Sequence, residues 1–186
     1  GSRPALPAVP GITLDGVHTF RDLRDVSALE AIARQGGNAV VIGGGLLGLE
    51  AAEGLRKRGG RALTVSVLQR SHRLMNRQLD TTAAQLLEAT LRERGILIET
   101  GASLAALEDN GRGQVQSVTL SDGRKLPADS VIVAAGITPN AELGQQSGLV
   151  CDRAIVVDGH LTTSDAHIHA LGECCQFEQH TYGLVE

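Results

Sequence analysis

Hydrophobic positions along this chain switch between short β-branched runs and longer segments with helical spacing. The apolar runs at 38–44, 63–69 and 96–101 have the length of buried strands. Segments 46–60 and 81–95 place apolar residues on one helical face, and each ends at glycine. The order strand, helix, strand, helix, strand predicts a parallel sheet with right-handed crossover connections.

The chain ahead of this region has a different pattern. The first 26 residues look irregular, with three prolines among the first ten, and they predict an extended connector. From Asp25 the spacing becomes helical, with Ser27 as the predicted N-cap and Glu30 three residues later. Gly36 and the glycine after it would end this segment. One more helix is therefore expected before the first strand of the sheet.

The second half of the chain carries shorter elements. Asp122-Gly123 lies between two strand-like runs and predicts a β-hairpin. The stretch 129–136 predicts another buried strand, and short strands are expected around Asp158-Gly159. Together the pattern predicts an α/β fold. It would be a three-layer, Rossmann-like domain whose central parallel sheet carries an inserted antiparallel meander.

A glycine-rich turn follows the first strand of the predicted sheet. Its spacing, Gly43-x-Gly45-x-x-Gly48 with a helix after it, is typical of a turn that holds a dinucleotide pyrophosphate. In that role Gly43 permits the tight turn, Gly45 lets the phosphates approach the backbone, and Gly48 lets the helix pack against the strand. Free N–H groups and the helix dipole would face the phosphates. The alternative is a flexible turn in an ordinary strand–helix unit.

Polar residues near the predicted loop bear on the choice of coenzyme. The acidic residue that usually holds the adenosine ribose is replaced by Gln69, which lacks the charge that repels a 2′-phosphate. Arg70 and Arg73 follow, and arginine beside the ribose is typical of NADP sites. Exclusive use of NADH is therefore in doubt, unless both arginines are only solvated loop charges. Glu50, in the first turn of the helix, faces either the nicotinamide cleft or solvent.

Composition narrows the class of protein. The 186 residues include no Trp, one Tyr and two Phe, so the core must be aliphatic, as in buried parallel sheets. A net charge of −4 without a basic block argues against nucleic-acid binding. No apolar run approaches the ~20 residues that cross a bilayer, and no signal region is visible, so a cytoplasmic protein is expected. The three cysteines lack a Cys-x-x-Cys spacing and signal no metal site, and Cys174-Cys175 are expected to be small buried hydrophobes.

Four separated stretches, in their order, resemble one family. They are VVIGGGLLGLEAA (40–52), LQRSHRLMNRQLD (68–80), DSVIVAAGITPNAEL (129–143) and LTTSDAHIHALGEC (161–174). They resemble the FAD-dependent pyridine nucleotide-disulfide oxidoreductase superfamily. The resemblance implies NAD(P)H and FAD as cofactors. It also implies a set of contact residues: Gly43, Gly45, Leu46, Leu47 and Gly48 at the pyrophosphate, Gln69, Arg70 and Arg73 at the ribose, Glu50, Gly136 and Ile137 near the nicotinamide, and Gly172 and Glu173 at the FAD, where most members have Asp in place of Glu173.

Two stretches narrow the resemblance further. LMNRQLD (74–80) and ALGECCQFEQHTYGLVE (170–186) are similar to the large subunits of NAD(P)H-dependent nitrite reductases. This resemblance implies hydride transfer from NAD(P)H to FAD. Electrons would then pass to an iron–sulfur and sirohaem centre outside this chain and reduce nitrite to ammonia in nitrogen assimilation.

The resemblance also implies a domain organisation. Residues 1–26 would leave a FAD domain, 27–145 would form the NAD(P)-binding domain, and 146–186 would return to the FAD domain. The family's earlier glycine motif, which binds the ADP half of FAD, does not occur in this sequence. We therefore expect the nucleotide-binding part of a longer flavoprotein, which by itself keeps no FAD and is inactive. Its partner would be the FAD domain of the same parent chain, and a homodimer of that parent is left open.

Three other functions compete with this interpretation. A rubredoxin or ferredoxin reductase would have the same nucleotide domain and differ only in the tail that follows Gly172. A non-catalytic nucleotide sensor needs no flavin motif, so Glu173 in its setting argues against it. A structural domain without nucleotide would bind neither coenzyme.

Overall fold

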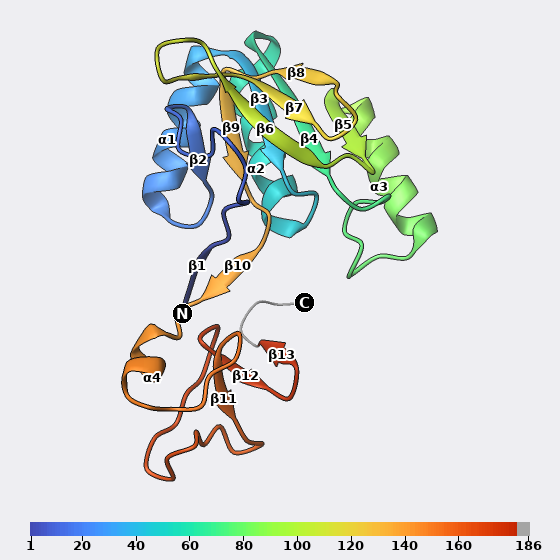
Figure 1. The fold of residues 1–186 in the computed structure, drawn as a ribbon. Coiled ribbons are helices and arrows are strands. Elements are labelled where there is room, and N and C mark those ends of the chain that lie inside the picture. The colour runs from blue at the N-terminus through green and yellow to red at the C-terminus, as the bar shows by residue number, and fades with distance from the viewer. Residues whose placement is uncertain (182–186) are drawn as a thin grey trace. The chain divides into compact units, whose positions relative to one another are not determined.

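The computed structural model describes residues 1–181, and the chain divides into two compact units (Figure 1). The larger unit is Pro4–Gly136, and the smaller unit combines Gly1–Arg3 with the chain from Ile137 onward. The last five residues of the stretch 170–186, which contributed to the resemblance, lie outside the described residues. The assignment of 1–26 and 146–186 to a FAD domain stays a prediction.

A five-stranded parallel sheet forms the centre of the larger unit, which confirms the predicted α/β architecture. In spatial order its strands are β2 (Val17–Thr19), β9 (Ser130–Val133), β3 (Gly37–Ile42), β4 (Leu63–Gln69) and β5 (Ile96–Thr100). Each neighbouring pair runs parallel. The carboxyl ends of β3 and β4 therefore meet at one edge of the sheet, where dinucleotides bind in open α/β folds.

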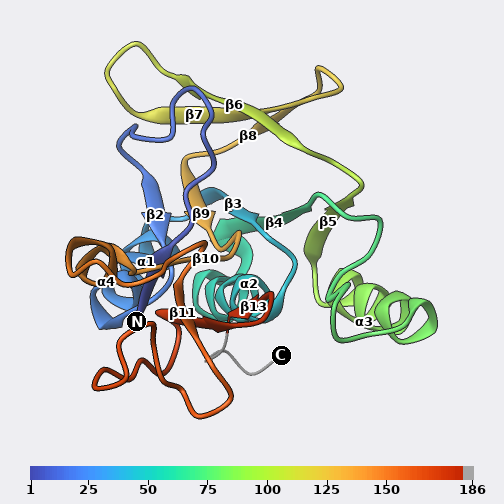
Figure 2. The same ribbon diagram turned by 60° about the horizontal axis from the view of Figure 1, so that its bottom comes forward.

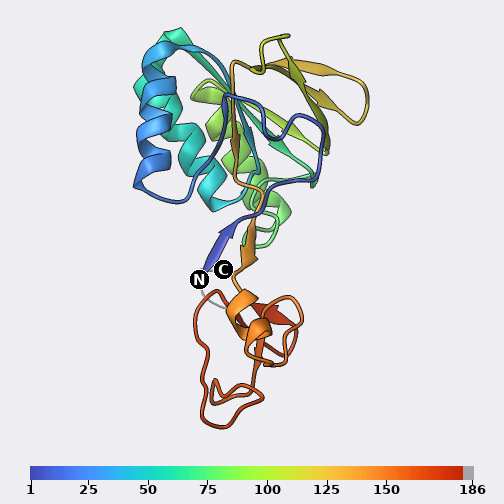
Figure 3. The same ribbon diagram turned by 60° about the vertical axis from the view of Figure 1, so that its left-hand side comes forward.

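The sheet is covered on both faces, so the larger unit has three layers (Figure 3). One face packs against three helices, α1 (Leu23–Gln35), α2 (Leu46–Gly59) and α3 (Thr81–Glu93). The other packs against the antiparallel meander β6 (Leu104–Asp109), β7 (Val115–Leu120) and β8 (Lys125–Pro127). Alternate strand residues divide between the two faces, because Val41 joins the helical core and Val40 joins the meander core. The predicted hairpin at 122–123 connects β7 to β8.

The start of α1 differs from the prediction that Ser27 is its N-cap. The helix begins at Leu23, and the Asp22 carboxylate accepts hydrogen bonds from the backbone N–H groups of Arg24 (2.7 Å) and Asp25 (3.2 Å). The Asp25 carboxylate in turn accepts from the backbone N–H of Asp22, which completes a capping box. The Ser27 hydroxyl lies one turn inside the helix and donates to the Leu23 carbonyl (3.1 Å). Helical periodicity located the helix, but two aspartates decide where it begins.

This capping box makes a testable prediction about stability. Asp22→Ala should lower the melting temperature by a few degrees, because two backbone N–H groups of α1 lose their acceptor. Ser27→Ala is the matched control, because its hydroxyl bonds only within the helix and alanine favours helix. Thermal unfolding followed by circular dichroism measures both. If Ser27→Ala lowered the melting temperature and Asp22→Ala did not, Ser27 would be the N-cap instead.

The prediction of an irregular connector over the first 26 residues is wrong in three places. β1 (Ser2–Pro4) pairs with β10 (Ile137–Pro139) in a two-stranded sheet. β2 is an edge strand of the central sheet, and α1 already begins at Leu23. Strands of three residues leave too little periodicity to recognise, and here distant partners supply the pairing.

The smaller unit is built from short elements. They are α4 (Glu142–Gln146), β11 (Ile155–Val157), β12 (Cys175–Phe177) and β13 (His180–Thr181). β11 ends just before Asp158, as predicted, but residues 160–174 contain no strand, only an isolated bridge between Thr162 and His169. Cys175 is fully buried in this unit's small apolar core, and burial raises the pKa of its thiol. In residues 1–181, no helix combines the length and apolarity that crossing a membrane requires.

Candidate dinucleotide-binding site

Gly43 turns the chain sharply out of β3. Its φ is 120°, a conformation that side chains rarely adopt, and its N–H donates to the Leu68 carbonyl (2.9 Å). A Cβ at this position would lie 2.2 Å from the Ala134 carbonyl oxygen. Both the backbone angle and the neighbouring strand therefore require glycine here.

Gly48 lies in the first turn of α2 and packs directly on the glycine loop. A Cβ at this position would lie 1.9 Å from the Gly43 carbonyl oxygen. The predicted close approach of helix and strand at Gly48 is confirmed, and its physical reason is contact between the two backbones.

Gly45 is different from its neighbours. It has an ordinary φ of −90°, and no atom of residues 1–181 lies within 4 Å of the place where its Cβ would be. Nothing in the fold itself therefore requires glycine at this position. The open side is the one on which a phosphate could approach the backbone, and Leu46 beside it is 46% exposed.

The beginning of α2 has no side-chain cap among the described residues. The other two long helices are capped by aspartates, α1 by Asp22 and α3 by Asp80, whose carboxylate accepts from the Ala83 N–H (2.8 Å). The first N–H groups of α2, those of Leu46 and Leu47 included, are thus left for an external acceptor. The glycine loop, the open space at Gly45 and the dipole of α2 together fit an anionic pyrophosphate.

Gly44 is a tightly packed position that the glycine spacing did not single out. A Cβ there would lie 2.6 Å from Leu74 Cδ2 and 3.1 Å from Gln69 Cβ. Its carbonyl accepts a hydrogen bond from the Met75 N–H (2.8 Å), and Met75 has a φ of 47°. The segment after β4 thus folds back against the glycine loop. The run of three glycines, in place of the usual Gly-x-Gly, was the signal in the sequence.

Gln69 ends β4 and bonds to the glycine loop. Its Oε1 accepts from the Gly44 N–H (2.8 Å), and its Nε2 donates to the Ser71 hydroxyl (2.5 Å). That hydroxyl donates to the Arg73 carbonyl (2.8 Å). The sequence predicted Gln69 at the adenosine ribose, and that role stays a prediction. The structure adds that its side chain bonds to the backbone of the glycine loop.

The two predicted arginines stand in different environments. Arg70 is exposed and has no hydrogen-bond or ion-pair partner within residues 1–181. Arg73 is partly buried, and its Nη2 donates to the Asn76 carbonyl (3.1 Å). Its Nε is buried without a hydrogen-bond partner in the described chain. Both cations follow the end of β4, on the segment that contacts the glycine loop.

Glu50 is exposed and borders an apolar groove beside α2. Helix α2 itself lies between α1 and α3 (Figure 2). The apolar residues of this groove are Leu46, Leu49, Met75, Leu79 and Leu87. Glu53, one turn further along α2, accepts hydrogen bonds from the Arg56 guanidinium (2.7 and 3.0 Å), which lowers the pKa of Glu53 to about 2. Glu53 is thus charged and paired. Glu50 is the fifth residue of α2, so the prediction that it lies in the first turn is wrong, because the helix already begins at Leu46.

The predicted flavin residues lie in the smaller unit. The Glu173 carboxylate accepts a hydrogen bond from the Ser2 hydroxyl (2.7 Å), although 171 positions separate the two residues. Gly172 has a φ of 80°, which glycine adopts without strain. Gly136 (φ 115°) closes the larger unit, and Ile137 opens β10. The sequence did not single out Ser2, because no local pattern connects it to Glu173.

Comparison with known proteins decides the family. The profile of the family described as "Pyridine nucleotide-disulphide oxidoreductase" matches residues 1–185. The chain belongs to the pyridine nucleotide-disulphide oxidoreductase family. This membership confirms the resemblance seen in the four stretches.

Individual relatives of this pyridine nucleotide-disulphide oxidoreductase chain carry different names. The chain is 41% identical to the "Nitrite reductase [NAD(P)H]" of Bacillus subtilis over all of its length, which is 22% of that relative. It is 34% identical to the crystal structure of a ferredoxin reductase from Rhodopseudomonas palustris, with a TM-score of 0.88 over 96% of this chain and 43% of the other. A FAD-dependent pyridine nucleotide-disulphide oxidoreductase from Desulfovibrio vulgaris matches with a TM-score of 0.82 and 34% identity, over 94% of this chain and 44% of the other. The chain therefore spans less than half the length of each.

Proposed function

We propose that this chain binds NAD(P)H at the glycine loop of the larger unit and positions it for hydride transfer to FAD in a longer flavoprotein. The observation that carries the proposal is the uncapped start of α2 beside Gly45. Gly43 and Gly48 are glycines because the fold crowds them, but Gly45 faces open space. A residue without a side chain, where the fold has room for one, indicates that a ligand approaches the backbone there.

The residues around the loop have separate tasks in this proposal. The N–H groups of Leu46 and Leu47 hold the pyrophosphate, and Gln69 keeps the loop in its binding conformation. Glu50, Gly136 and Ile137 are proposed to contact the nicotinamide end. When bound, the nicotinamide and the flavin supply the hydride chemistry, and the protein contributes binding and orientation.

Gly172 and Glu173 are proposed to contact FAD. The Ser2 hydroxyl already orients the Glu173 carboxylate, which fits a residue that must accept hydrogen bonds from a ligand hydroxyl. The remaining FAD contacts would come from the parent chain outside these residues. The FAD domain of that parent is accordingly the proposed partner, and a homodimer remains part of the proposal for the whole protein.

For the electron acceptor we favour nitrite, reached through an iron–sulfur and sirohaem centre elsewhere in the parent. The support is the 41% identity to a nitrite reductase along the full chain. The second candidate is transfer to a ferredoxin or rubredoxin, which the likeness to a ferredoxin reductase structure favours. Reduction of nitrite by the NAD(P)H-reduced parent, compared with reduction of a ferredoxin, separates the two.

Heteronuclear NMR of the isotope-labelled chain tests nucleotide binding directly. Adding NADH or NADPH should shift the backbone amide signals of Gly45, Leu46 and Leu47 in a saturable way. The amide of Gly111, in the turn between β6 and β7, serves as the internal control, because this turn bonds through the Gly113 carbonyl to Asp15 at the amino end of β2. Unchanged loop amides at millimolar coenzyme would contradict the proposal.

A further inference from the structure

We propose that the site takes NADPH in preference to NADH, with Arg70 as the residue that reads the 2′-phosphate. This inference rests on the proposed function, since it concerns the coenzyme of the same site. Three observations carry it: the bonding of Gln69, the absence of Asp and Glu from residues 63–79, and the guanidinium of Arg70, which has no partner in residues 1–181.

The first observation concerns the direction of the hydrogen bonds at Gln69. The Ser71 hydroxyl has one proton, which it donates to the Arg73 carbonyl (2.8 Å), so toward Gln69 it must accept. The Gln69 amide nitrogen therefore faces Ser71, and its oxygen faces the Gly44 N–H (2.8 Å). The second amide proton points toward Asn76 Oδ1 (3.4 Å). The side chain is thus occupied within the protein and offers no charged acceptor to the ribose hydroxyls.

The second observation concerns charge. An NADH-selective site uses a carboxylate at this position, which accepts from the ribose hydroxyls and repels a 2′-phosphate. Residues 63–79 contain three arginines and a histidine but neither Asp nor Glu. Two neighbouring carboxylates are engaged elsewhere. Asp80, which follows this segment, caps α3, and Glu99, the strand neighbour of Leu68 on β5, pairs with Arg124 (2.8 Å). No negatively charged side chain in residues 63–79 would repel a second phosphate on the adenosine ribose.

The third observation concerns the cation that would meet this phosphate. Arg70 follows Gln69 directly, is exposed, and has no partner in residues 1–181. Arg73 adds positive charge, but its guanidinium already bonds to the Asn76 carbonyl. A free guanidinium next to the ribose position can take a phosphate in a bidentate hydrogen bond. Arg70 is therefore the specificity-determining residue, and Arg73 adds to the positive electrostatic potential around it.

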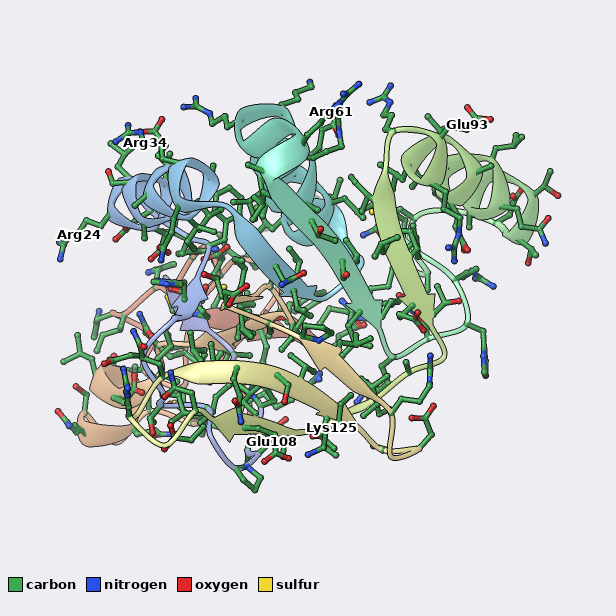
Figure 4. The ribbon with its side chains drawn as sticks, turned by 90° about the horizontal axis from the view of Figure 1, so that it is seen from above. Arg24, Arg34, Arg61, Glu93, Glu108 and Lys125 are labelled. Carbon is green, nitrogen blue, oxygen red and sulfur yellow. The ribbon has the colours of Figure 1, made fainter. Side chains whose placement is uncertain are left out.

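Isothermal titration calorimetry of the chain with NADPH and with NADH tests the inference. NADPH should bind at least about tenfold more tightly, as expected for a charge-assisted hydrogen bond. Arg70→Ala should remove most of this difference by weakening NADPH alone. The matched control is Arg61→Ala in the turn between α2 and β4 (Figure 4), which removes the same charge at the opposite end of β4 and should change neither affinity. Gln69→Glu should lower the ratio of NADPH affinity to NADH affinity, because a carboxylate at the ribose position repels the 2′-phosphate.

Each other outcome has a definite meaning. Equal affinities, or tighter binding of NADH, overturn this inference and leave the proposed function standing. If Arg70→Ala weakened the affinity for both coenzymes equally, the inference would also be overturned, because the arginine would then not recognise the 2′-phosphate. Binding of neither coenzyme at millimolar concentration defeats the proposed function and this inference with it. Competition by 2′,5′-ADP against NADPH gives a second readout, and Arg70→Ala should weaken that competitor by the same factor.

Discussion

Gly45→Val is expected to abolish coenzyme binding without unfolding the protein. The backbone angles of Gly45 suit any residue, and in the described part of the chain no atom lies within 4 Å of its Cβ position, so the fold can hold the new side chain. The same side chain would fill the space through which the pyrophosphate reaches the N–H groups of α2. Because several charge-assisted hydrogen bonds are lost together, affinity for either coenzyme should fall by on the order of a hundredfold.

Calorimetric titration measures the affinity, and thermal unfolding of the same sample measures the fold. The matched control is Gly60→Val, at the other end of α2, where nothing lies within 4 Å of the Cβ position either. This control should bind coenzyme normally even though its φ of 56° makes a side chain strained. Normal coenzyme affinity in Gly45→Val would show that the pyrophosphate does not approach here, and the glycine loop would then be only a turn.

Gly48→Ala is expected to destabilise the folded chain strongly. Its Cβ would lie 1.9 Å from the Gly43 carbonyl oxygen, and the loop cannot yield easily because Gly43 is itself pressed against the Ala134 carbonyl. Helix α2 would have to move away from β3 and its buried contacts at Ala51 and Ala52. Overpacking of this kind costs about 3 kcal/mol in the free energy of unfolding.

Urea denaturation measures this loss, and the same helix supplies its control. Gly54 is also a glycine in α2, but no atom lies within 4 Å of its Cβ position. Gly54→Ala should therefore stabilise the protein by up to about 1 kcal/mol, because alanine is the better helix former. Opposite signs for the two substitutions would establish backbone contact as the cause. Equal effects would mean that Gly48 is not in close contact with the loop.

The two pairs of substitutions separate folding from binding within one motif. Gly43, Gly44 and Gly48 are required by contacts within the protein, whereas Gly45 faces open space. A glycine count or a spacing cannot make this distinction, because it depends on which atoms lie opposite each residue. The family assignment is independent of these tests, since it rests on a match over residues 1–185.

Local sequence determined much of the fold of this protein. Periodicity along the chain predicted β3, α2, β4, α3 and β5 in order, with ends within a few residues of those observed. It succeeded because burial against a sheet imposes a repeat on neighbouring positions, and the chain displays that repeat directly. The glycine loop was recognisable for a similar reason, since tight turns and close packing restrict which residue types the backbone accepts.

Only the tertiary structure decided the contacts between distant positions. β1 and β2 are too short to show a repeat, and they are strands because β10 and β9 pair with them. The start of α1 depended on Asp22 and Asp25 meeting across one turn, which periodicity does not register. Such features depend on local geometry or on the partner that the folded chain provides, and the residue's own type does not specify them.

The same division applies to the candidate site. The sequence predicted cofactor contacts for Gln69 and Glu173, which stay predictions, but it could not say what each side chain contacts within the protein. Folding brings Gln69 to the Gly44 N–H, 25 positions away, and Glu173 to the Ser2 hydroxyl, 171 positions away. Hydrogen bonds are short and directional, so a shift of about 1 Å in the packing of either partner would break them. The sequence by itself therefore indicated which segments carry the predicted coenzyme contacts, and the packing of distant segments decided which of their polar atoms already bond within the protein.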